Sequence, residues 1–81
     1  MNEEVYKEEF ALEVMRRIDD FKAFFVYQID VLETYEEAKE SMKDFDEPLE
    51  EDEFFRIICI EYDEDGEEIG FYTLYEDGCE Y

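Results

Sequence analysis

The sequence contains no histidine and no tryptophan, and only seven of its 81 residues are lysine or arginine. Histidine is the side chain most often used in general acid–base catalysis. The only serine, Ser41, lies in a charged segment with no sign of an activating base, and three glycines are too few for a glycine-rich phosphate loop. We therefore expect a protein that is not an enzyme and that uses no cofactor.

A metal site is the nearest chemical alternative. Glu61, Asp63, Asp65 and Gly66 have the spacing of the first half of a calcium-binding EF-hand loop. The twelfth position, where a bidentate glutamate is required, is Tyr72, and both flanking segments have the composition of strands rather than helices. The pattern favours a hairpin turn, and we expect no specific metal ligands.

Long apolar runs are also missing, since no segment approaches the ~18 residues of a membrane helix. The acidic N-terminal segment lacks the apolar core of a signal peptide. The two cysteines, Cys59 and Cys79, then fit reduced thiols in a reducing compartment. We expect a cytoplasmic protein that does not contact membranes.

Acidic residues dominate what is present: 28 aspartates and glutamates give a formal net charge of −21. A compact domain of this length is roughly 30 Å across, and duplex DNA carries one charge per ~1.7 Å. The charge per unit length is therefore close to that of DNA. The basic patch expected of a nucleic-acid-binding protein is absent, so the sequence predicts a basic protein partner and no direct contact with nucleic acid. The alternative is that the acidity serves solubility.

The hydrophobic fraction of 46% is enough for one folded domain over residues 1–81. Residues 3–18 have a stripe of apolar side chains at helical spacing, which predicts a helix with Glu8, Glu9 and Glu13 outside that stripe. A second helix is expected from Thr34 to about residue 46, because Thr34 and Glu37 form a capping box and Pro48 ends the pattern.

Three segments have the β-branched and aromatic composition of strands: 23–32, 54–62 and 68–75. The last six residues are expected to fray. The fold class is then α+β, in the order α-β-α-β-β, with a mixed three-stranded sheet and two helices. A strand–helix–strand unit favours parallel pairing of its two strands. Because the strands are apolar on both faces, a sheet face without a helix would need a partner, and we expect a weak homodimer.

Most of the negative charge lies in the second half of the chain, where residues 44–81 have a net charge of −15 and residues 1–43 a net charge of −6. Two acidic segments flank the strand at 54–62, and tyrosines, which are enriched at interface hot spots, lie close to the second. The candidate partner-binding residues are Asp44, Asp46, Glu47, Glu50, Glu51, Asp52, Glu53, Glu61, Tyr62, Asp63, Glu64, Asp65, Glu67, Glu68 and Tyr72.

In size, charge and acidic runs such as Asp44 to Glu53 and Asp63 to Glu68, the chain resembles the small DNA-mimic inhibitors of phages and mobile elements, of the anti-CRISPR and anti-restriction type. The resemblance implies a non-enzymatic inhibitor that occupies the basic nucleic-acid-binding site of a nuclease or of another DNA- or RNA-binding enzyme. Two alternatives stay open: an immunity protein that neutralises a nuclease toxin, and a structural or regulatory subunit whose acidity keeps it in solution.

Overall fold

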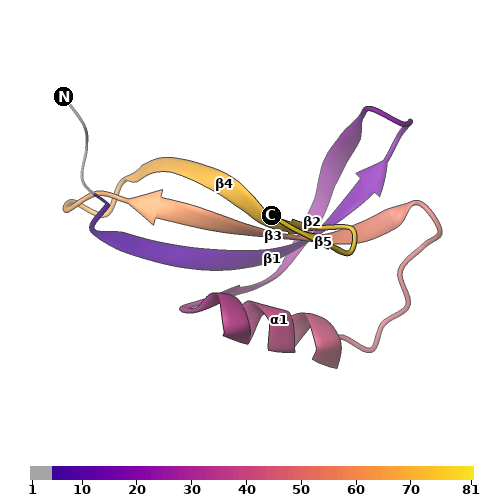
Figure 1. Ribbon diagram of the computed structural model, residues 1–81, viewed down its shortest axis with the longest axis horizontal. Coiled ribbons are helices and arrows are strands. Elements are labelled where there is room, and N and C mark those ends of the chain that lie inside the picture. The colour runs from indigo at the N-terminus through magenta and orange to yellow at the C-terminus, as the bar shows by residue number, and fades with distance from the viewer. Residues whose placement is uncertain (1–4) are drawn as a thin grey trace.

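One antiparallel sheet with a single helix against one face makes up the fold (Figure 1). The computed structural model describes residues 5–81. The strands run in the spatial order β2-β1-β3-β4-β5. In chain order the elements are β1 (Lys7–Arg17), β2 (Ala23–Leu32), α1 (Tyr35–Asp44), β3 (Glu53–Tyr62), β4 (Glu68–Glu76) and β5 (Cys79–Glu80).

The expectation of a mixed three-stranded sheet with two helices is therefore wrong. The strands expected at 23–32, 54–62 and 68–75 are confirmed as β2, β3 and β4, with β3 and β4 each one residue longer. Every pair in the sheet is antiparallel. The β2–α1–β3 connection does join two strands of the same direction, but β1 lies between them in the sheet, so they do not pair.

The segment expected to be the first helix is the inner strand β1, and residues 3 and 4 of that prediction lie outside the described residues. The five consecutive residues Ala11 to Met15 are all buried. Both faces of this stretch are therefore buried, and the strand lacks the alternation of a half-exposed strand. The same apolar positions then match a helical spacing, and strand pairing overrides the helix-favouring composition of this segment.

The second predicted helix is confirmed as α1. The Thr34 hydroxyl accepts a hydrogen bond from the Glu37 amide at 3.1 Å, as expected of an N-cap. The return half of the capping box differs, because the Glu37 carboxylate accepts from the Thr34 hydroxyl, also at 3.1 Å, rather than from the Thr34 amide.

The core lies between α1 and the sheet face that it covers, which we call the helix face. Leu12 of β1, Ile57 of β3 and Ala38 of α1 are fully buried at its centre. Leu12 and Ile57 are directly opposite each other in the β1–β3 ladder, so their side chains share this face. Around them pack Phe10, Ile29, Leu32, Tyr35, Met42, Phe55 and Tyr75.

The opposite face, here the open face, has no helix over it among residues 5–81. Register irregularities in the β1–β2 pair bend β2, and the β1–β2 hairpin rises on the side of the sheet away from α1 (Figure 1). Glu13 and Arg56 are opposite each other on the open face, and the Arg56 Nε donates to Glu13 Oε1 at 2.9 Å. Their side chains are only 9% and 18% exposed, so Glu13, expected on a solvated helix surface, is instead a buried partner of Arg56.

The chain end is also ordered, contrary to the expected fraying. Gly78, with φ +87°, turns the chain back so that β5 pairs with Tyr75 and Glu76. Glu80 then accepts hydrogen bonds from the Tyr35 hydroxyl and the Lys39 ammonium, both at 3.2 Å. These contacts tie the C-terminal segment to α1.

Removing one partner of the Glu13–Arg56 pair leaves an uncompensated charge in a largely buried position. We expect Arg56→Met to lower the free energy of unfolding by about 3 kcal/mol. The double variant Glu13→Leu/Arg56→Met replaces the pair by apolar contacts, and we expect it to recover stability to within about 1 kcal/mol of the wild type. Urea unfolding measures both values, and a double variant as unstable as the single one would contradict the prediction.

Candidate functional site

Two groups of exposed carboxylates lie at opposite ends of the molecule (Figure 1). The acidic loop, residues 44–53, joins α1 to the start of β3, and the acidic turn, residues 63–68, follows the end of β3. Nine strand residues, 54–62, separate the two groups, a span of ~30 Å. This separation is most of the longest dimension of the described chain, which is 42 Å, so the two groups do not converge on one compact site.

The acidic loop is held in place at both ends. The Phe45 amide donates to the Met42 carbonyl, and the Phe45 ring meets the Phe55 ring edge-on with centroids 5.6 Å apart. At the other end, the backbone amide of Glu53 donates to the Glu50 carbonyl at 3.0 Å. The loop is therefore a fixed support for its side chains.

Not all carboxylates of the acidic loop are free to bind a partner. Glu53 has a side chain only 9% exposed, accepts from the Glu50 amide at 2.9 Å and pairs with Arg16 at 3.1 Å. Asp52 lies 3.6 Å from the Arg16 Nε. The remaining five side chains are exposed and are paired with no cation among residues 5–81: Asp44, Asp46, Glu47, Glu50 and Glu51.

In the acidic turn, Asp63 has a structural role. Its Oδ1 accepts from the amides of Asp65 and Glu67, each at 2.9 Å. Gly66 has φ +84°, a conformation that glycine adopts without strain, and its amide donates to the Asp63 carbonyl. These bonds hold the hairpin closed and leave four exposed carboxylates pointing to solvent: Glu64, Asp65, Glu67 and Glu68.

The candidate tyrosines do not form one surface with the turn. Tyr62 lies opposite Lys7 on the open face, and a hydrogen bond to Glu9 is the main cause that raises its pKa. Tyr72 lies opposite Cys59 on the helix face. Glu61, half-buried, shares that face with Glu8. Tyr62 and Tyr72 therefore face opposite sides of the sheet.

Tyr72 belongs to a small polar cluster beyond the end of α1. The Cys59 Sγ, fully buried, donates to Glu8 Oε2 at 3.2 Å. Burial is the main cause that raises the pKa of the Cys59 thiol to about 11. The hydrogen bond with Cys59 raises the pKa of Tyr72 to about 12, with burial contributing next. Both groups are neutral at physiological pH.

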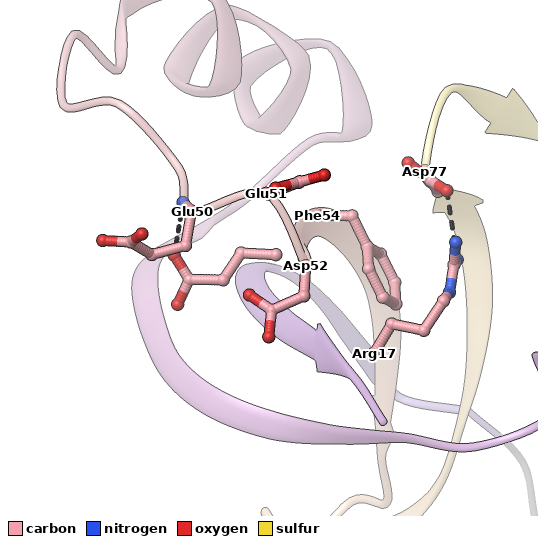
Figure 2. Close-up of a pocket in the computed structure, with 7 residues that line it drawn as sticks. Arg17, Glu50, Glu51, Asp52, Phe54 and Asp77 are labelled. Carbon is pink, nitrogen blue, oxygen red and sulfur yellow. Dashed lines mark hydrogen bonds and ion pairs between the residues drawn. The ribbon is translucent and has the colours of Figure 1, made fainter. Parts of the chain in front are cut away.

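A pocket of about 610 Å³ opens between the acidic loop and the end of β4 (Figure 2). The Arg17 guanidinium lies 4.8 Å from the centroid of the Phe54 ring, and its Nη2 pairs with Asp77 Oδ2 at 3.0 Å. Glu50, Glu51, Asp52 and Glu53 line the rest of the pocket. Here a guanidinium is bound by a ring and a carboxylate at once.

Sequence reasoning missed Arg17, Phe54 and Asp77 as members of this site. Asp77-Gly78 is itself a strong turn dipeptide, and it could have placed Asp77 at an ordered hairpin. The contact between Arg17 and Asp77 links residues 60 positions apart, and no local pattern indicates it.

Within residues 5–81, no group of three or more potential metal-binding side chains comes together, and no helix has the length and apolar character needed to cross a membrane. Comparison of the chain with protein-family models, with curated proteins and with solved structures found no match.

The raised pKa values of Cys59 and Tyr72 predict a loss of stability at alkaline pH. The ordinary pKa values are 9.0 for the thiol and 10.0 for the phenol, and folding raises them to about 11 and 12. Because the folded state favours the neutral forms, their contribution is complete below pH 9 and is lost as the pH rises through the folded values. We expect the Cys59 thiol alone to account for about 2 kcal/mol of unfolding free energy lost between pH 9 and 11.

Urea unfolding at intervals between pH 7 and 11 measures this loss. Cys59→Ala is the matched control, because it removes the thiol and leaves the titrating lysines unchanged. The variant is expected to have a flatter profile between pH 9 and 11. Equal slopes for the wild type and the variant would contradict the assignment.

Proposed function

We propose that this protein is a non-enzymatic inhibitor that blocks the basic nucleic-acid-binding site of a nuclease or of another DNA- or RNA-binding enzyme. Its exposed carboxylates take the place of phosphates against the lysines and arginines of the target. The observation that carries the proposal is the two sets of exposed, unpaired carboxylates, five in the acidic loop and four in the acidic turn, at opposite ends of the sheet.

The distribution of the ion pairs supports this assignment. The lysines and arginines that pair among residues 5–81 lie on β1, α1 and β3, and their partners are mostly side chains with structural roles, such as Glu13, Glu53 and Glu80. The exposed carboxylates of the acidic loop and acidic turn are left for an external cation. The negative electrostatic field of these carboxylates also speeds association with a basic partner.

The spacing and the rigidity of the two groups also suit a nucleic-acid mimic. A separation of ~30 Å is close to the rise of nine base pairs at ~3.4 Å each. Both groups are anchored by hydrogen bonds and by strand β3, so presenting them to a target incurs little ordering entropy.

The pocket beside the acidic loop supports a preference for arginine in the target. Arg17 occupies part of it, stacked on Phe54 and paired with Asp77. Guanidinium groups both stack on rings and pair with carboxylates. On the remaining wall, the exposed carboxylates of Glu50 and Glu51 are available to pair with a target arginine.

The proposal places the protein in the cytoplasm, where nucleases and their nucleic-acid substrates meet. Cys59 and Cys79 are free thiols, which is consistent with a reducing compartment.

Affinity capture from a host lysate at low salt, followed by elution with duplex DNA or with RNA, tests the proposal. We expect captured proteins to be nucleic-acid-binding enzymes that nucleic acid displaces. The purified target should lose activity when this protein is added, and excess substrate should restore the activity. Captured proteins that nucleic acid does not displace would favour the role of a regulatory subunit.

Affinity for the captured target should fall steeply with salt, because exposed charges are screened beyond ~8 Å at physiological ionic strength. We expect at least about a tenfold loss of affinity between 0.05 and 0.5 M salt, by analogy with phosphate contacts. Isothermal titration calorimetry over this range gives the dependence. An affinity that does not change with salt would exclude the electrostatic mechanism.

Neutralising four exposed carboxylates in each acidic group should locate the contact. The loop variant is Asp46→Asn, Glu47→Gln, Glu50→Gln and Glu51→Gln, and the turn variant is Glu64→Gln, Asp65→Asn, Glu67→Gln and Glu68→Gln. Both leave out the structural residues Glu53 and Asp63. Because like charges are removed from exposed positions, we expect unchanged or slightly higher stability, and at least about a tenfold loss of target affinity for each variant.

A control with the same change in net charge separates location from total charge. Asp20, Glu33, Glu36 and Glu40 are exposed, lie outside both acidic groups and have no ion pair among residues 5–81. Changing these four to the corresponding amides should lower the affinity much less. Equal losses for all three variants would show that only the net charge matters.

A further inference from the structure

The outer edge of β2 is the longest unpaired strand edge of the described chain. β2 lies at one end of the sheet order and pairs on one side only, with β1. Its outward backbone amides and carbonyls have no strand partner. An exposed edge of this length is a template for pairing with another strand.

Apolar side chains accompany this edge. Phe24, Phe25, Tyr27 and Val31 are 44%, 49%, 39% and 36% exposed. By register, Phe25 and Val31 lie on the open face, opposite Met15 and Ala11, while Phe24 and Tyr27 lie on the helix face. Apolar surface is therefore exposed on both sides of the same edge, where an added strand would cover it.

The same strand is the least charged part of the molecule. Of the 28 acidic residues, β2 contains only Asp30, and it contains no lysine or arginine. The Asp30 carboxylate accepts from the adjacent Val31 amide at 2.9 Å. The residues of β2 themselves offer a basic segment only one carboxylate, whereas a neutral apolar strand fits their composition.

The other edge of the sheet is protected at the two ends of β4. The acidic turn lies at one end of β4, and β5 pairs with its other end at Tyr75 and Glu76. The Tyr81 amide extends this cover by donating to the Leu74 carbonyl at 2.8 Å. Charged residues and short covering strands are common means of preventing edge-to-edge pairing, and β2 has no covering strand and a single charged residue, Asp30.

We propose that the β2 edge is a self-association surface, at which two copies of this chain pair β2 antiparallel to β2 about a two-fold axis. An antiparallel strand pair of identical sequence is self-complementary, as a two-fold interface requires. The two sheets then become one continuous sheet, and the acidic loops and acidic turns of both copies stay exposed to solvent. The dimer goes beyond the proposed inhibition and does not depend on it.

Charge repulsion opposes this dimer and gives it a characteristic salt dependence. Each copy has a net charge of −21. The pKa of Tyr27 is raised by burial and then by Glu47 and Glu53, so the acidic loop lies close enough to β2 to act on it. Added salt screens the repulsion, and the dimer should tighten with salt, the reverse of the contact with a basic target.

Sedimentation equilibrium of the full chain with a reductant tests the proposal. At ~0.05 M salt we expect mostly monomer, and at ~0.5 M salt a dimer, with at least about a tenfold lower dissociation constant. A monomer at ~1 mM protein in high salt would overturn the proposal, and so would a dimer that dissociates as salt is added.

Phe25→Glu and Phe71→Glu form a matched pair of variants. Both phenylalanines lie on the open face, and they are 49% and 57% exposed, but Phe25 is on β2 and Phe71 on β4. We expect Phe25→Glu to weaken the dimer at least about tenfold and Phe71→Glu to leave it within about threefold. Equal weakening would indicate that the open faces stack instead, and this would overturn edge pairing.

Amide hydrogen exchange of the wild-type protein gives a readout that does not depend on the folding of a variant. In high salt, the outward amides of β2 should become protected as the protein concentration rises, and those of β4 should not change. Concentration-dependent protection in β4, or none in β2, would overturn the proposal.

Discussion

The pairing of β1 with β3 is the interaction on which the rest of the structure depends. Their ladder runs from Lys7–Tyr62 to Arg16–Glu53 without a shift in register. It brings Leu12 beside Ile57 on the helix face and Glu13 beside Arg56 on the open face. β2 and β4 add to the outer sides of this pair, and α1 covers it. Because β3 is central, the segments before and after it emerge at opposite ends of the sheet, and both are acidic.

The sequence predicted those elements whose own residues specify them. Thr34 and Glu37 mark the start of α1, Asp65-Gly66 marks a turn, and the aromatic and β-branched runs mark β2, β3 and β4. Residues 7–17 contain no such marker. Whether they form a helix or a strand depends on pairing with other segments, including β3, whose Arg56 lies 43 positions from Glu13. The number of helices and the mixed pairing were wrong for this reason, and the number of strands was wrong also because β5 forms where the chain end was expected to fray.

The candidate site was predictable to a similar extent. Acidic runs indicated where carboxylates gather, and the structure places those runs in the acidic loop and the acidic turn. The sequence could not separate the carboxylates that face solvent from those that accept hydrogen bonds from backbone amides of the loop and the turn, such as Glu53 and Asp63. That distinction depends on hydrogen bonds to particular amides. The contribution of Arg17 to the loop pocket likewise depends on a contact with the far end of the chain.

The position of β1 between β2 and β3 has a consequence for how the chain folds during synthesis. β1 is made first, but its partner on one side, β3, is made only after β2, α1 and the acidic loop. Contacts between distant parts of a chain form slowly, so the β1–β2 hairpin exists for a time with one side of β1 unpaired. Strand edges exposed in this way promote aggregation. The high negative charge repels neighbouring chains during that interval, and it therefore opposes aggregation of the nascent protein.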